Sequence, residues 1–255
     1  MSLDLAFEDK GAGAPLVILH GLFGSQRNWT SHAKALAEQR RVITVDLRNH
    51  GASPWSSTHT YEAMAGDVAG LLNDLELDAV TLLGHSMGGK AAMVLALNGE
   101  PRLDRLIVVD IAPVAYDHTH ADFIDAMTGL DLARMESRSE VDRALEQRIG
   151  DKAIRAFLMT NLMKDGEGYR WRLNLESLAS NMDALSGFPA AGATCSLPTR
   201  VITGANSAYV DDRGEQALGE LFTDCHVERI ADAGHWVHAE QPERFSRALD
   251  RALRE

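Results

Sequence analysis

The chain has 255 residues, of which 45% are hydrophobic and 24% charged, so it is long and apolar enough to bury a full core, and this composition excludes disorder. Its formal net charge of −12 repels phosphate backbones, and we expect no nucleic-acid binding. The acidic N-terminus lacks the apolar stretch of a signal peptide and no long apolar run occurs, so the sequence predicts a cytoplasmic protein without a membrane span.

Short apolar runs alternate with helical patterns along the chain. The runs predict strands at 16–19, 42–47, 79–83, 106–111, 200–203 and 227–230. Several are apolar throughout, which is typical of strands buried on both faces of a parallel sheet. The helical patterns cover 29–39, 61–75, 87–97, 211–221 and 242–253. This alternation predicts an α/β fold with a mostly parallel central sheet flanked by helices.

One interval between predicted strands is about three times as long as the others, which are each about one βαβ unit of roughly 30 residues. Residues 115–189 fill it, and Ala153, Ile154, Phe157 and Leu158 fall on one face at helical spacing. We therefore expect a core formed by residues 1–114 and 190–255, and an all-helical cap of residues 115–189. The cap is inserted after the strand that ends near Asp110.

The segment 79–90 contains the pattern Gly84-x-Ser86-x-Gly88 between a predicted strand and a predicted helix. That strand–turn–helix context is what a nucleophile elbow requires. Ser86 is therefore the candidate nucleophile. The Met87 amide, at the start of the helix, is expected to donate to a substrate oxyanion.

The same residues also match the spacing of a phosphate-binding P-loop, Gly84-x-x-x-x-Gly89-Lys90. That loop needs Ser or Thr after the lysine to hold Mg²⁺, and this chain has Ala91 there. The nucleophile elbow is therefore the favoured interpretation.

A serine hydroxyl needs a base, and the base should follow later in the chain. His235 stands in a loop between the last predicted strand and the last predicted helix, and it is the candidate base. His238 is the local rival, although it is expected to pack or cap near the helix. A His235/His238 metal pair is the other alternative, but it lacks further ligands, so we expect no metal.

The oxyanion hole needs a second amide from a loop after an early strand. His20-Gly21 ends such a strand, and the glycine allows a turn that aims the Leu22 amide into the site.

Together these motifs resemble the α/β-hydrolase superfamily, in the order His20-Gly21, the Ser86 elbow and Gly234-His235. The stretches 20–25, 46–51, 109–113 and 234–239 are similar to those of YbfF-type bacterial serine esterases. The resemblance covers nearly the whole chain. It implies an α/β-hydrolase fold with a small helical cap and a serine hydrolase of carboxylic esters or thioesters.

The acid that should orient His235 stands at a different position in this chain than in many superfamily members. They carry it three residues beyond a glycine after the penultimate strand, where this chain has Ser207, whose hydroxyl cannot stabilise an imidazolium as a carboxylate does. Asp110, at the end of the previous strand, can act instead, and YbfF-type esterases resemble this chain in that arrangement. Asp211 remains the alternative. Ser207 is then expected to be an auxiliary hydrogen-bond partner of Asp110 or His235.

The sequence thus predicts a Ser86–His235–Asp110 hydrolase that forms an acyl-enzyme on a small-molecule ester or thioester and needs no cofactor. Perhydrolysis and C–C bond hydrolysis with the same triad are alternatives, and so is a non-enzymatic binding protein on a hydrolase scaffold. Arg27 is a candidate to meet an anionic substrate group. Six apolar cap residues either line a pocket or pack the cap helices together: Phe123, Met127, Phe157, Leu158, Met159 and Leu162.

Overall fold

The computed structural model describes residues 2–117, 120–189 and 192–254. One sheet has seven strands in the order β1-β3-β2-β4-β5-β8-β9, and every pairing is parallel except that of β1 with β3. The strands are β1 (Phe7–Lys10), β2 (Pro15–Leu19), β3 (Arg41–Val45), β4 (Val80–His85), β5 (Leu103–Val109), β8 (Thr199–Gly204) and β9 (Cys225–Ile230). The predicted mostly parallel α/β sheet and its six predicted strands are confirmed.

Strand β1 was not predicted, because it has no apolar run. Three of its four residues are charged, and it forms the exposed antiparallel edge of the sheet. Charged side chains are common on edge strands, where they discourage pairing with other chains.

Helices cover both faces of the sheet, because alternate residues of each strand point to opposite sides. On one face lie α2 (Tyr61–Asp74), α3 (Met87–Leu97) and α9 (Asp212–Leu221), which pack on strand residues such as Leu82. On the other face lie α1 (Thr30–Leu36) and α11 (Pro242–Ala252), which pack on residues such as Leu83. The short helix α10 (Val237–Glu240) precedes α11.

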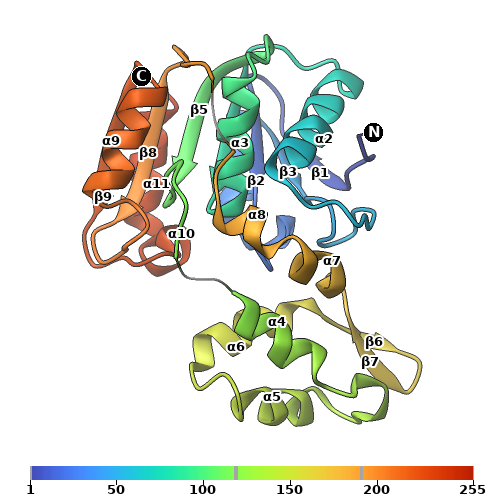
Figure 1. The fold of residues 1–255 in the computed structure, drawn as a ribbon. Helices are drawn as coiled ribbons and strands as arrows, with labels where there is room; N and C mark the ends of the chain where they lie inside the picture. The colour runs from blue at the N-terminus through green and yellow to red at the C-terminus, as the bar shows by residue number, and fades with distance from the viewer. Residues whose placement is uncertain (1, 118–119, 190–191, 255) are drawn as a thin grey trace.

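A separate group of elements, which we call the cap, occupies the long interval between β5 and β8 and lies beyond the carboxyl ends of the parallel strands (Figure 1). Its helices are α4 (Ala121–Thr128), α5 (Arg138–Glu146), α6 (Lys152–Leu158), α7 (Leu175–Ser180) and α8 (Met182–Ser186). The predicted limit of the cap between residues 189 and 190 borders residues 190–191, which lie outside the described part of the chain.

The expectation of an all-helical cap was wrong. The cap contains an antiparallel hairpin, β6 (Leu162–Asp165) and β7 (Gly168–Trp171). Gly166 in its turn has φ +57°, and a Cβ on Gly168 would lie 2.4 Å from the Ala133 carbonyl oxygen. The two glycines allow a tight turn and a close approach that the helical pattern of the preceding residues did not reveal.

Within the described residues, no helix is long and apolar enough to cross a membrane.

A buried ion pair fixes the segment that follows β3. The Arg48 guanidinium donates to both carboxylate oxygens of Asp67, at 2.6 and 2.8 Å, and to the carbonyls of Thr58 and Ala63. Both side chains are buried, and Asp67 also accepts from the Leu3 amide at 2.7 Å. The pair therefore ties the N-terminus and the 46–60 segment to α2.

We predict that Asp67→Ala lowers the free energy of unfolding by about 3–5 kcal/mol, because it leaves the Arg48 charge buried and unpaired. Asp9→Ala is the control, since it breaks the half-exposed Arg41–Asp9 pair. That change should cost at most about 1 kcal/mol. Urea unfolding of both variants measures the difference. Equal losses of unfolding free energy in the two variants would contradict the conclusion that the buried Arg48–Asp67 pair stabilises the fold.

Candidate active site

Ser86 lies in the sharp turn between β4 and α3. Its backbone has φ 52° and ψ −119°, a strained conformation for a residue with a Cβ. The turn is tight because a Cβ on Gly84 would lie 2.2 Å from the Gly88 carbonyl oxygen. A Cβ on Gly88 would lie 2.5 Å from the carbonyl oxygen of His20 in the neighbouring loop. Glycine is therefore required at both positions, as the nucleophile-elbow pattern demands.

The structure brings Ser86, His235 and Asp110 together, although they come from distant parts of the chain. His235 Nε2 is 3.0 Å from Ser86 Oγ, and His235 Nδ1 is 2.7 Å from Asp110 Oδ2. A carboxylate only accepts, so Nδ1 carries the proton. Nε2 is then free to accept from the serine hydroxyl, which is the arrangement that activates a serine nucleophile.

The Asp110 carboxylate is completely buried, and four hydrogen bonds satisfy it. Thr203 Oγ1 and the Gly204 amide donate to Oδ1, at 2.5 and 3.0 Å. Ser207 Oγ and His235 Nδ1 donate to Oδ2, at 2.6 and 2.7 Å. Ser207 thus contacts Asp110, one of its two expected partners.

Three other sequence candidates take no part in these hydrogen bonds. Asp211 is the N-cap of α9 and accepts from the Gly214 amide at 2.8 Å. His238 is buried and stacks on Trp29 with ring centroids 4.5 Å apart, and burial lowers its pKa to about 3. Arg27 is exposed and does not line the cavity above Ser86.

The loop after β2 lies against the nucleophile. A Cβ on Gly21 would come within 2.9 Å of the His85 ring and 3.2 Å of Ser86 Cβ. The next amide, that of Leu22, therefore lies close to Ser86. Within the described residues, neither the Leu22 nor the Met87 amide donates a hydrogen bond to another protein group. Both are free to bind a ligand oxygen.

Two buried histidines hold this loop in place. His20 Nδ1 donates to the Gly21 carbonyl, and its Nε2 accepts from the Leu47 amide at 3.0 Å. His50 Nδ1 donates to the Arg48 carbonyl, and its Nε2 accepts from the Phe23 amide at 3.2 Å. Each ring donates once and accepts once, which only the neutral form can do. Burial accordingly lowers the pKa of His20 to about 4 and that of His50 to about 3.

Sequence reasoning missed three residues around the base and the acid. The Tyr209 ring stacks on the His235 imidazole with centroids 4.1 Å apart, and the Thr203 hydroxyl donates to Asp110. His85 also contributes, because its Nε2 donates to the His235 carbonyl at 3.0 Å. None of these contacts follows a periodic pattern, although Thr203 could be suspected as a polar residue that follows the apolar Val201 and Ile202 near the end of β8.

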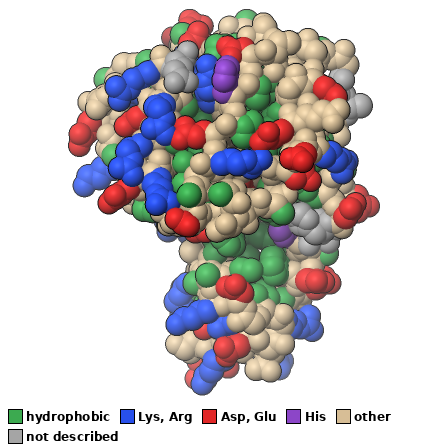
Figure 2. Space-filling view, turned by 90° about the vertical axis from the view of Figure 1, so that its left-hand side faces the viewer, with side chains coloured by type: hydrophobic (Ala, Val, Ile, Leu, Met, Phe, Trp, Pro, Cys, Tyr) green, Lys and Arg blue, Asp and Glu red, His purple; other side chains and the backbone are tan. Residues whose placement is uncertain are grey.

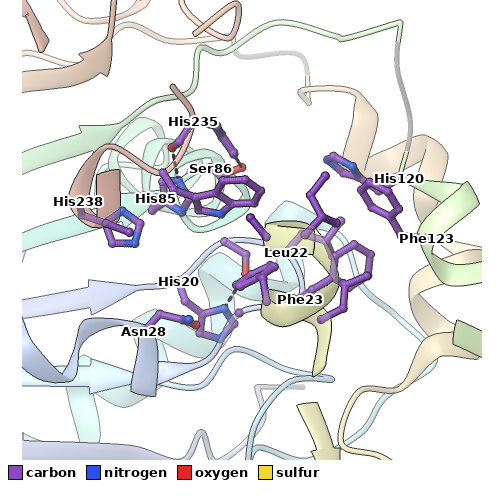
Figure 3. A pocket seen from close by; sticks show the side chains of 18 of the residues that line it. His20, Leu22, Phe23, Asn28, His85, Ser86, His120, Phe123, His235 and His238 are labelled. Carbon is purple, nitrogen blue, oxygen red and sulfur yellow. Dashed lines mark hydrogen bonds between the residues drawn. The ribbon is translucent and has the colours of Figure 1, made fainter. Parts of the chain in front are cut away.

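A cavity of about 670 Å³ opens above Ser86 between the core and the cap. Ser86 and His235 face the cap residues His120 and Phe123 across it, with Leu22 between them (Figure 3). Hydrophobic side chains gather where the cap meets the core (Figure 2). Of the six apolar cap residues, Phe123, Phe157 and Leu158 line this cavity, whereas Met127, Met159 and Leu162 do not.

Lys90, one turn after Ser86, anchors both connections to the cap. Its buried ammonium donates to the carbonyls of Val114 at 2.8 Å, Gly187 at 2.5 Å and Ser186 at 3.4 Å. It also lies 4.6 Å from the ring centroid of Tyr116. The lysine that fits a P-loop pattern by spacing thus has all three of its donors bonded to the chain's own carbonyls.

The fold and this arrangement of a serine, a histidine and an aspartate are those of α/β hydrolases. The chain belongs to the family described as the alpha/beta hydrolase fold, whose model matches residues 14–242.

Curated relatives and a solved structure agree with this membership. The chain is 42% identical to the sn-1-specific diacylglycerol lipase ABHD11 of Mus musculus, over 92% of this chain and 79% of that protein. It is 36% identical to esterase YbfF of Escherichia coli K12, over 94% of this chain and 93% of that protein, which confirms the predicted resemblance. A marine microorganism esterase of known structure superposes with a TM-score of 0.94 at 36% identity, covering 98% of this chain and 99% of that one.

The buried histidines make stability depend on pH. The unfolded chain protonates His50 near its ordinary pKa of 6.5, whereas the folded chain keeps it neutral down to about pH 3. The unfolded state therefore binds more protons in this range, and the folded state loses stability as the pH falls below about 6.5.

We predict that His50→Gln weakens this acid sensitivity. Between about pH 6 and 4, its free energy of unfolding should fall less steeply than that of the wild type, by up to about 1.4 kcal/mol per pH unit. Urea unfolding at several pH values measures the slopes. His226→Gln is the control, because the His226 side chain is 71% exposed. Parallel slopes for wild type and His50→Gln would contradict the prediction.

Proposed function

We propose that this protein hydrolyses carboxylic esters or thioesters through a covalent acyl-enzyme on Ser86. The observation that carries the proposal is the continuous chain of hydrogen bonds from Ser86 through His235 to Asp110 at the base of a cavity. Residues 115–189 act as the cap that closes this cavity from the other side. The protein needs neither a metal nor an organic cofactor for this reaction.

In the first half-reaction, Ser86 Oγ attacks the substrate carbonyl carbon while His235 Nε2 takes the hydroxyl proton. Asp110 holds Nδ1–H and stabilises the imidazolium that forms. The carbonyl oxygen becomes an oxyanion and accepts from the Leu22 and Met87 amides. The intermediate collapses when Nε2 returns its proton to the leaving oxygen or sulfur, which departs as an alcohol or thiol.

In the second half-reaction, water attacks the acyl carbon while His235 Nε2 takes its proton. The second tetrahedral intermediate uses the same oxyanion hole. Nε2 then protonates Ser86 Oγ, and the carboxylic acid leaves. One ester and one water give one acid and one alcohol, and the enzyme is restored.

The relatives support ester hydrolysis over the alternatives. One is named a diacylglycerol lipase and two are named esterases, and all share the cleavage of an ester bond. A non-enzymatic scaffold has no need of a bonded serine, histidine and aspartate. Perhydrolysis and C–C bond cleavage use the same three groups, but among the described residues that line the cavity no contact favours either over hydrolysis.

We predict that Ser86→Ala lowers kcat/KM for p-nitrophenyl esters by at least about 10³-fold, because only the oxyanion hole and binding remain. The variant should also lose covalent labelling by a fluorophosphonate probe. Ser180→Ala, which alters an exposed serine of α7, should keep both properties. A folded Ser86→Ala protein with undiminished turnover would refute the mechanism.

We predict that Asp110→Asn lowers kcat by about 10⁴-fold, because an amide does not stabilise the His235 imidazolium as a carboxylate does. Asp211→Asn should leave kcat nearly unchanged, since Asp211 caps α9. Ser207→Ala should give an intermediate loss, because it removes one of four donors to Asp110. Steady-state kinetics with melting curves measures all three. Loss of activity in Asp211→Asn alone would show that the acid is misassigned.

A further inference from the structure

Two cavities meet at Ser86. The large one has about 670 Å³, and a second one has about 40 Å³. Both are lined by Ser86, Leu22, His120 and Tyr209. The point where the substrate carbonyl must lie is therefore a junction between two spaces of very different size.

Apart from these four shared residues, different elements line the two spaces. His235 and the residues that follow it, Trp236 and His238–Glu240, line only the large cavity. The small chamber is bounded instead by the first residues of α3, by the segment that follows β5 and by the last cap helix, α8. Its walls include Met87, Ile111, Tyr61, Met182 and Leu185.

The tetrahedral intermediate has four substituents on one carbon, and the site accounts for three of them. One is Ser86 Oγ, and the second is the oxyanion, which accepts from the Leu22 and Met87 amides. The third is the leaving atom, which must lie beside His235 Nε2 to receive its proton. His235 lines only the large cavity, so the leaving group extends there. The fourth substituent, the acyl carbon, then points to the remaining opening.

We infer that the small chamber is the acyl pocket, and that this protein prefers short, uncharged acyl groups joined to a large apolar alcohol or thiol. The inference rests on the proposed function and specifies its substrate class.

The chamber volume sets the acyl length. A group the size of a water molecule needs about 10–15 Å³ of cavity volume. The chamber has about 40 Å³, so it admits about three non-hydrogen atoms beyond the carbonyl carbon. That range corresponds to acyl groups from acetyl to butyryl. Met182 and Leu185 form part of the apolar wall and are each only 7% exposed, while the Tyr61 hydroxyl donates to the Leu185 carbonyl at 2.6 Å.

The lysine in the chamber wall does not favour an acidic acyl group. An ammonium has three donors, and those of Lys90 are directed to the carbonyls of Val114, Ser186 and Gly187. None is left for a substrate carboxylate. The opposite wall of the large cavity is mostly apolar, because the cap contributes Phe123, Ile154, Phe157 and Leu158 beside the polar His120 and Asp122. The chemistry of that wall suits a bulky apolar leaving group.

The first test is a pair of substrate series with the wild-type protein. With p-nitrophenol as the constant leaving group, kcat/KM should fall at least about tenfold from butyrate to octanoate, because the longer chain exceeds the chamber. With acetate as the constant acyl group, kcat/KM should rise from ethyl to hexyl to decyl esters. Equal or higher values for octanoate, or a fall with longer alcohols, would overturn the inference.

The second test enlarges the chamber. Met182→Ala should raise the ratio of octanoate to butyrate kcat/KM by about tenfold, and Leu185→Ala serves as a second variant if Met182→Ala does not fold. Met159→Ala is the matched control, because this cap methionine is also 7% exposed but lines neither cavity, and it should leave the ratio unchanged. An unchanged ratio in a folded Met182→Ala protein would overturn the inference.

Measurements on Ser86→Ala separate the proposed function from the assignment of the acyl pocket. If turnover of all these esters persists in Ser86→Ala, the proposed function itself is wrong. If turnover requires Ser86 but increases with acyl length, the function stands and only the assignment of the small chamber falls.

Discussion

The buried charge of Asp110 is the constraint on which the site depends. A carboxylate without solvent is tolerated only when its oxygens are fully hydrogen-bonded. Here the donors come from the end of β8, from the loop after it, and from the loop that follows β9. Since β5, β8 and β9 are neighbours in the sheet, satisfying this one charge fixes His235 in position relative to the strand ends.

The nucleophile is held by close packing rather than by charge. Ser86 keeps a strained backbone because β4 and α3 fix both of its sides, and the glycines around it let neighbouring backbones approach. The loop that carries the Leu22 amide is fixed against it by Gly21 and by the neutral imidazoles of His20 and His50. The half of the site with Asp110 and His235 is therefore sensitive to loss of a hydrogen-bond donor. The half with Ser86 and the Leu22 loop is sensitive to added side-chain volume and to protonation of the buried histidines.

Sequence patterns predicted those features that leave a local signal. The six parallel strands contain short apolar runs, and the Ser86 turn has glycines at fixed offsets, so both were found. Strand β1 and the β6–β7 hairpin were missed because the first is charged and the second has no strict alternation of polar and apolar residues. Tyr209 was missed because its stacking on His235 depends on how two loops meet. The choice between Asp110 and Asp211 needed the absence of a carboxylate at position 207.

The position of the cap affects the shape of the small chamber more directly than it affects the geometry of the triad. Ser86, Asp110 and His235 all come from the core, and their mutual hydrogen bonds involve no cap residue. Met182 and Leu185 belong to α8. Lys90 donates to the Ser186 and Gly187 carbonyls at the end of that helix. A shift of the cap about this ammonium would therefore move the wall of the chamber while leaving the triad distances intact. Differences in acyl preference among proteins with this architecture are then expected to arise from α8 and the residues that lead from it back to the core, rather than from the catalytic groups.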